Sequence, residues 1–333
     1  MALKTLLEDV KSYSGFQSKK RLQRVLLNMQ ACSDSSIQNG DDTAVIPNGD
    51  GFNLFAMEGF IPEFVANDPW FAGWCGVMVN CSDIAAMGGV PVAVTNSIWC
   101  QDDDALMQMA RGMNAASQAF GVPIVGGHTC QDSPLNQLSV SIIGHATHVL
   151  SSFDAKPNHV LLCAIDLRGE YREPFLNWNA ATSAPSGQLQ QDIALLPKVA
   201  SMPGVSGAKD ISQAGLLGTA AMFMDCSRCG VEIDLDRIPK PAHVSWLDWL
   251  RSFPSFGYLI TCEADVAPQV LAIFQQRNIH AACIGQLNNS ARITVTHQQE
   301  NDVFWDFHKK PFMMPSTHTT SSSEEPDYAR NYL

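Results

Sequence analysis

No apolar run in this chain of 333 residues approaches the length of a membrane-spanning helix, although 46% of its residues are hydrophobic. The opening stretch, MALKTLLEDVKSYSG, is too polar for the apolar core of a signal peptide. These two absences predict a globular, cytoplasmic protein without a membrane partner. The length is sufficient for two domains.

Charged side chains are scarce, at 16% of the residues, and basic ones are the scarcer kind, which leaves a formal net charge of -12. The longest basic run is Lys19-Lys20-Arg21. This charge balance argues against nucleic acid as the main partner and leaves a small-molecule substrate as the expectation. An acidic protein that handles phosphate usually needs metal ions to bridge the like charges.

Several familiar catalytic motifs are also missing. The chain has no GxxxxGK[ST] loop, no GxGxxG after a strand, no HExxH and no GxSxG, which excludes P-loop, nicotinamide-binding, zinc-peptidase and hydrolase-elbow chemistry. Ten cysteines follow no regular framework, which predicts reduced thiols. The pair Cys226 and Cys229 lacks a second such pair, so a structural use is favoured over a zinc site.

The stretch from Asp68 to Pro91 has apolar residues at three- and four-residue steps, which predicts a buried helix that ends at Gly88-Gly89. A second stripe on this helix holds Gly73, Gly76, Asn80 and Asp83. We interpret the glycines as clearance for a ligand that Asn80 and Asp83 contact. The alternative is that the glycines serve helix–sheet packing and that Asp83 is a local cap.

Further acidic residues stand at the boundaries of predicted elements. Asp41 and Asp42 lead from an Asn-Gly turn into a β-prone run, Glu58 ends the strand 52–57, and Asp210 opens a helical segment. Oxygen ligands of this kind suit Mg²⁺. Each residue also has an ordinary explanation, since adjacent acids are tolerated in a solvated turn and capping alone explains an Asp before a helix.

Two other segments are candidates for phosphate contacts. Gly126-Gly127-His128-Thr129 interrupts the buried strand 122–125, and paired glycines there allow a backbone to approach a phosphate, or simply form a tight turn in which His128 hydrogen-bonds locally. Lys19 and Lys20 belong to one or two predicted helices near the N-terminus. They either lie on a solvated helix face or close over a bound polyphosphate.

The remaining pattern predicts an α+β fold, because strands and helices alternate in a way that places helices over a sheet. We expect a helical arm over residues 1–37, a first domain over 38–150, a second over 158–300 and a disordered tail over 315–333. Residues 150–158, which are small and polar, form the predicted linker.

Several blocks occur in a recognisable order: GDDTAV, AMEGFIPEFVANDPWFAGW, VNCSDIAAMGGVP, VGGHT, KDISQAGLLGTA, FGYLIT and ACIGQL. This order resembles the superfamily of aminoimidazole ribonucleotide (AIR) synthase, thiamine-monophosphate kinase, selenophosphate synthetase and the hydrogenase maturation protein HypE. It is most similar to the uncharacterised AIR synthase-related branch, over residues 38–297.

The resemblance implies a PurM-like architecture, with an N-terminal ATP-binding α/β domain whose sheet forms a homodimer and a C-terminal ferredoxin-like α/β domain. It also implies that ATP and Mg²⁺ lie in a cleft between subunits and domains. The implied metal ligands are Asp41, Asp42, Glu58, Asp83 and Asp210. The implied nucleotide contacts are Asn80, Asp83, Gly126, Gly127, His128 and Thr129, and the candidate catalytic residues are Lys19, Lys20 and His128.

Some positions depart from the superfamily pattern. Glu58 stands where relatives usually carry Asp, and the reactive cysteine of selenophosphate synthetases has no counterpart, because the context of Cys32 does not match. The resemblance therefore implies a Mg-ATP-dependent phosphotransferase or ATP-activating synthase whose acceptor is unknown. The alternative is a non-catalytic nucleotide-binding protein that regulates or scaffolds a partner.

Overall fold

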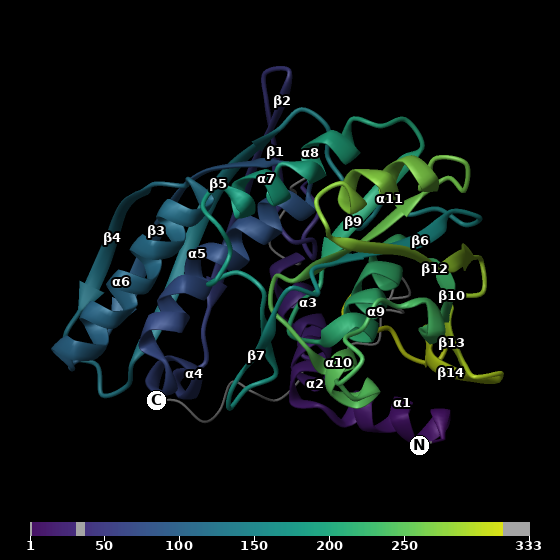
Figure 1. Cartoon of the computed structure of the whole chain (residues 1–333), viewed down its shortest axis with the longest axis horizontal. Helices are drawn as coiled ribbons and strands as arrows, with labels where there is room; N and C mark the ends of the chain where they lie inside the picture. Colours follow the sequence, from purple (N-terminus) through teal and green to yellow (C-terminus); the bar gives the residue numbers. More distant parts are fainter. Residues whose placement is uncertain (1, 31–36, 316–333) are drawn as a thin grey trace.

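The computed structural model describes residues 2–30 and 37–315 (Figure 1). The predicted disordered tail from Ser316 onward, the end of the helical arm and Cys32 lie outside the described residues. Within the described part of the chain, no helix is both long and apolar enough to cross a membrane.

Three helices form the N-terminal arm: α1 (Leu3–Ser12), α2 (Ser14–Lys20) and α3 (Leu22–Gln30). Leu3, Leu6, Leu7 and Val10 lie on one face of α1 at helical spacing and are buried. Phe16 packs against Phe304, Trp305 and Phe312, so the arm is anchored on the C-terminal half of the chain. The sequence predicted one or two helices here, and the structure has three.

The first half of the chain forms a five-stranded sheet with helices on one face (Figure 1). The strand order is β1-β2-β5-β3-β4, and only β3 and β4 pair in parallel, because α6 connects them as a crossover. The elements are β1 (Ala44–Asn48), β2 (Gly51–Gly59), α4 (Pro62–Asn67), α5 (Pro69–Ala86), β3 (Val90–Trp99), α6 (Asp103–Phe120), β4 (Ile124–Cys130) and β5 (Gln137–Ala146).

The central helix α5 is confirmed, but the glycines on it do not provide clearance for a ligand. A Cβ on Gly73 would lie 2.1 Å from the Met109 carbonyl oxygen of α6, and a Cβ on Gly76 would lie 2.7 Å from Val140 of β5. The packing alternative is therefore the correct one for these residues. Small side chains let the backbones of α5 and α6 approach closely.

The segment from Gly126 to Thr129 also differs from the prediction of a turn. It continues β4, where Gly126 pairs with Thr95 and Thr129 pairs with Ile98 of β3. The ladder of hydrogen bonds along β3 satisfies the backbone in this extended form, so pairing outweighs the turn tendency of the two glycines.

The second half forms a seven-stranded sheet with the order β14-β13-β10-β12-β6-β11-β9. Helices α1, α9 and α10 pack on one face, and α8 and α11 pack on the other. The strands are β6 (Val160–Ile165), β9 (Val205–Asp210), β10 (Gly230–Asp234), β11 (Gly257–Cys262), β12 (His280–Asn288), β13 (Arg292–His297) and β14 (Glu300–Asp306).

A small hairpin of β7 (Glu170–Arg172) and β8 (Asn177–Asn179) precedes the helices of this half. The helices are α7 (Gln188–Ile193), α8 (Leu195–Ala200), α9 (Gly215–Ser227), α10 (Trp246–Arg251) and α11 (Ala267–Gln275). Because α9 begins at Gly215, Asp210 ends β9 and does not cap a helix. The capping explanation of Asp210 is therefore wrong.

Candidate functional site

A cavity of about 340 Å³ lies where the N-terminal arm meets the two sheets. Helix α3 of the arm supplies one wall, and β2, α4 and α5 supply another. Residues from β8, β9 and the loop at Phe253 come from the second half of the chain. Such a meeting point of domains is a common location for a ligand site, and the volume suits a small molecule.

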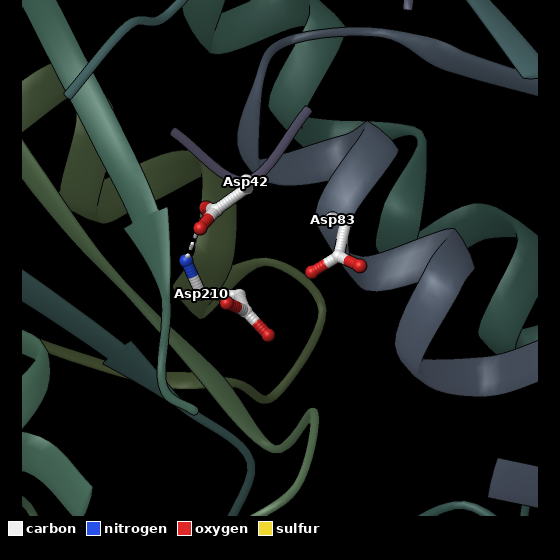
Figure 2. A group of neighbouring side chains, drawn as sticks. All are labelled: Asp42, Asp83 and Asp210. Carbon is white, nitrogen blue, oxygen red and sulfur yellow. Dashed lines mark hydrogen bonds between the residues drawn. The ribbon is translucent and has the colours of Figure 1, made fainter. Parts of the chain in front are cut away.

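Three carboxylates converge in this cavity from distant parts of the sequence: Asp42 before β1, Asp83 on α5 and Asp210 at the end of β9 (Figure 2). Each offers one oxygen, and these oxygens all lie within 4.8 Å of one another. We call these three residues the acid triad. Asp83 and Asp210 are almost completely buried, at 4% and 3% exposure.

The negative charges of the acid triad favour either protonation of its carboxyl groups or the binding of a cation. Burial, followed by the neighbouring Asp210, Glu58 and Asp42 carboxylates, holds the pKa of Asp83 well above its ordinary value. Burial and the Asp42 carboxylate likewise raise the pKa of Asp210 to about 8. Closely spaced buried carboxylates cannot all ionise without a compensating charge.

A magnesium ion fits this donor set. The Oδ2 atom of Asp83 is buried and has no hydrogen-bond partner, which is costly for a polar atom unless something binds it. All three potential ligands are carboxylate oxygens, the kind that Mg²⁺ prefers. The acid triad therefore has the oxygen ligands, the close spacing and the unpartnered carboxylate oxygen that a divalent-cation site requires.

Lys209 lines the cavity and contacts the acid triad, and the sequence did not predict it there. Its ammonium group donates a hydrogen bond to the Asp42 carboxylate and lies 4.0 Å from Asp41. Burial alone lowers the pKa of Lys209, but the Asp42 and Asp41 carboxylates raise it above its ordinary value, so the side chain is charged. Its strand, β9, reads VSGAKD, and no local pattern in this segment marks the lysine as buried.

Asp41 makes a different set of contacts from its neighbour Asp42. Its carboxylate accepts hydrogen bonds from the Ser151 hydroxyl at 2.7 Å and from the Ser152 amide and hydroxyl at 2.8 and 2.5 Å. It also accepts one from the Asp42 amide at 3.0 Å. Asp41 lines the cavity, but its oxygens are already engaged in fixing the segment between the two sheets.

Glu58 lines the cavity from the end of β2, next to the acid triad. Burial raises the pKa of its carboxyl group, while the positive charge of Lys19 lowers it and Asp42 raises it further. Lys19 also lines the cavity. In contrast, the Lys20 ammonium donates to Gln17 and lies 5.8 Å from the centre of the Trp305 ring.

Asn80 is completely buried and does not line the cavity. Its Nδ2 atom donates to the carbonyl oxygens of Gly76 and Val140, at 2.7 and 3.0 Å, and so ties α5 to β5. Gly126, Gly127, His128 and Thr129 are exposed on the edge strand β4 and also lie outside the cavity walls. A single chain does not bring this segment to the acid triad.

The cysteines of the described part of the chain are all free, which agrees with reduced thiols. Cys226 and Cys229 are buried, and neither belongs to a group of potential metal ligands among the described residues.

Two family models match the chain. One is described as AIR synthase related protein, N-terminal domain, and matches residues 40–146. The other is described as AIR synthase related protein, C-terminal domain, and matches residues 180–298. The first match contains Asp42 and Asp83 and the second contains Asp210, so the acid triad lies between the two matched domains.

Three known proteins are similar to this chain in sequence. The Synechocystis protein called Uncharacterized protein sll0787 is 41% identical over 83% of this chain and 86% of its own length. Uncharacterized protein MJ0640 of Methanocaldococcus jannaschii is 33% identical over 93% of this chain and 98% of its own. A selenide, water dikinase of Clostridioides difficile is 30% identical over 61% of this chain and 60% of its own.

Solved structures share the fold at low sequence identity. AaThiL complexed with AMPPCP and TMP has a TM-score of 0.61 at 17% identity, covering 83% of this chain and 93% of that chain. T. maritima PurL complexed with ATP has a TM-score of 0.70 at 15% identity, covering 98% of this chain and 55% of that chain.

Proposed function

This chain belongs to the AIR synthase-related family and has the two-domain, α+β PurM-like fold that its motifs predict, and on that basis we propose that it uses ATP with Mg²⁺ to phosphorylate a small-molecule acceptor. Relatives named selenide, water dikinase and thiamine-monophosphate kinase support the use of ATP in this superfamily.

The acid triad is the observation that carries this proposal. Asp42, Asp83 and Asp210 would hold the metal, and the Oδ2 atom of Asp83 is already without a partner. The bound Mg²⁺ would neutralise charge on the transferring phosphoryl group. Lys209 donates a hydrogen bond to Asp42 and holds its carboxyl group in place, and Lys19 places a further positive charge at the cavity wall.

The proposed reaction is the transfer of the γ-phosphoryl group of ATP to the acceptor. A lone pair of the acceptor forms a bond to the γ-phosphorus of ATP, and the bond from that phosphorus to the β–γ bridging oxygen breaks. The electron pair of the broken bond leaves with ADP, and the proton of the acceptor passes to water. The protein contributes positioning and charge stabilisation.

The test is a thermal unfolding series with Mg²⁺ alone, ATP alone and both together. Binding to the folded state raises the midpoint, and at a hundredfold excess over the dissociation constant it stabilises the protein by about 2.7 kcal/mol. We expect the large shift to need both ligands, to disappear in Asp83→Asn, and to persist in Asp265→Asn, an exposed control on the second domain. The absence of any shift in the wild type would contradict the proposal.

The alternative is a nucleotide-binding regulator or scaffold without turnover. The two proposals differ in one product, because only the phosphotransferase releases ADP when an acceptor is present. Release of ADP that depends on Asp83 would exclude the regulator. Binding of Mg-ATP without ADP release across a broad acceptor panel would favour it.

A homodimer is part of the proposal, and the outer face of the first sheet supports it. Phe55, Met57 and Ile143 are 49%, 67% and 40% exposed, while Leu54 and Ala56, which alternate with them on β2, are buried under α5. Phe55 pairs directly with Ile143, so the exposed side chains are contiguous. An apolar patch of this kind marks an interaction surface.

The second copy would bring Gly126, Gly127, His128 and Thr129 to the nucleotide, since these residues are exposed on the sheet edge of their own chain. A mixing experiment tests this. Asp83→Asn chains and Gly127→Glu chains should each bind Mg-ATP poorly, but mixed dimers carry one intact site, so about a quarter of the sites should recover. No recovery after subunit exchange would contradict a shared site.

We also propose a cytoplasmic location. Cytoplasm supplies ATP, and the free, mostly buried cysteines of the described residues suit a reducing compartment. Fractionation of cells that produce the protein tests this location.

A further inference from the structure

We infer that the acceptor is an electrically neutral molecule with an apolar body and a hydrogen-bond donor group, and that it is not a phosphate ester. This inference rests on the proposed phosphotransferase function and specifies the substrate class of the same cavity. Three observations on the cavity wall support it.

The first observation is that most of the side chains that line the cavity outside the acid triad are apolar. Its side chains come from the arm, from the first sheet and its helices, and from the loops of the second half. We call the following residues the apolar wall: Leu26, Phe60, Phe64, Val79, Phe175 and Phe253. A wall with several aromatic rings binds an apolar molecular body by burying its surface.

The second observation concerns the cations. Among the described residues that line the cavity, the basic side chains are Lys19 and Lys209, and no arginine or histidine is present. Lys209 is paired with Asp42, and Lys19 acts on the Glu58 and Asp210 carboxylates. Both positive charges therefore already interact with carboxylates of the acid triad and of Glu58.

A phosphate group against the apolar wall would lack a partner. Sites that bind phosphate esters usually supply arginine or lysine donors, which give charge-assisted hydrogen bonds. An anion placed against apolar side chains loses its hydration without compensation. The cavity thus selects against the phosphate-bearing compounds that the thiamine-monophosphate kinase relatives take by name.

The third observation is a pair of buried polar atoms without hydrogen-bond partners. The Oδ1 atom of Asn177 and the hydroxyl of Ser212 are both unpaired, and both residues line the cavity. Asn177 is only 2% exposed and forms a β-bridge with Phe253 of the apolar wall, whereas Ser212 follows Asp210 by two positions. An amide or alcohol N–H or O–H of the acceptor would satisfy the Asn177 oxygen.

The experiment compares matched probes that differ in charge. Neutral aryl amides and alcohols, such as 2-phenylacetamide and benzyl alcohol, are titrated against benzyl phosphate in the presence of Mg²⁺ and a non-hydrolysable ATP analogue. Ligand-observed NMR gives the dissociation constants. We expect the neutral probes to bind at least about tenfold more tightly than benzyl phosphate.

Two cavity variants and one control variant locate the binding. Val79→Trp fills the cavity from α5 and should abolish neutral-probe binding, while Val303→Trp, at a position on β14 outside the cavity, should not change it. Asn177→Leu should raise the dissociation constant of 2-phenylacetamide by about fivefold or more, because the hydrogen bond to the Asn177 oxygen is lost. A retained Mg-ATP shift in thermal unfolding identifies folded variants, and Val79→Phe replaces Val79→Trp if that shift is lost.

The outcomes separate this inference from the proposed function. Equal or tighter binding of benzyl phosphate, no measurable binding of any neutral probe, or neutral-probe binding that survives in a folded cavity-filling variant would overturn the inference. The Mg-ATP shift would still stand in those cases. Neutral-probe binding without any Mg-ATP shift would instead support the cavity assignment and contradict the ATP proposal.

Discussion

The Lys209 ammonium group and the Asp42 carboxylate form a buried ion pair, with side-chain exposures of 4% and 6%. Removing one partner of a buried pair leaves an uncompensated charge, at a cost of about 3–5 kcal/mol. We therefore expect Lys209→Met to lower the free energy of unfolding by about 3 kcal/mol in urea without Mg²⁺. Saturating Mg²⁺ should recover more of the stability in this variant than in the wild type.

The double variant Lys209→Met with Asp42→Asn is the control for this prediction. Because it removes both charges, its loss of stability should be smaller than the sum of the two single losses. A Lys209→Met protein as stable as the wild type would show that the pair contributes nothing.

The pH dependence of stability follows from the acid triad. The pKa of Asp210 is about 8 in the folded protein, against an ordinary value of 3.8, so between these limits the folded state holds a proton that the unfolded chain has lost. Stability without metal should therefore fall as the pH rises through this window. The raised pKa values of Asp83 and Asp42 act in the same direction.

Unfolding in urea at about pH 5, 7 and 9, with and without Mg²⁺, measures this effect. The stabilisation by Mg²⁺ should increase with pH, because the cation replaces the protons. An Asp210→Asn variant should show a weaker dependence. Stability that rises toward pH 9 without metal would contradict the electrostatic account of the site.

Close contact between α5 and α6 gives a packing prediction. A Cβ on Gly112 would lie 1.8 Å from the Trp70 carbonyl oxygen, whereas a Cβ on Gly59 would have no neighbour within 4 Å. Gly112→Ala should lower the free energy of unfolding by about 1–3 kcal/mol, because the added methyl group overpacks the contact between the two helices. Gly59→Ala should be close to neutral in the same urea titration, and equal effects would show that the helices separate easily.

The exposed face of the first sheet predicts the effect of a surface charge. Phe55→Glu should shift the protein from dimer to monomer in sedimentation velocity, because it places a charge at the centre of the apolar patch. Val303→Glu, at a residue with a similar exposed fraction of 42% on β14, should leave the association unchanged. A monomeric wild type would contradict the proposed homodimer.

The sequence predicted the fold class and the main helix because these depend on periodic patterns. Local capping is a pattern of the same kind: Asp102 precedes α6 and accepts hydrogen bonds from the amides of Asp104 and Ala105. The family blocks also gave Asp41, Asp42, Glu58, Asp83 and Asp210 as expected metal ligands, and oxygens of three of them, Asp42, Asp83 and Asp210, lie within 4.8 Å of one another.

Other features depended on contacts that no local pattern encodes. Lys209 looks like a surface lysine until β9 places it against the Asp42 turn. Asn80 and the α5 glycines share the stripe of Asp83, but α6 and β5 cover them. The segment at Gly126 reads as a turn because glycine favours turns, whereas pairing with β3 keeps it extended. Tertiary contacts outweighed local preference in each case.

The most direct test of the account is anomalous diffraction from crystals grown with Mn²⁺ in place of Mg²⁺ and a non-hydrolysable ATP analogue. The account predicts a manganese peak between the carboxylates of Asp42, Asp83 and Asp210, at about 2.0–2.2 Å from their oxygens and next to the triphosphate. It also predicts that this peak is absent in Asp83→Asn crystals. A nucleotide bound elsewhere, or a triad without manganese at saturating concentration, would contradict the central claim.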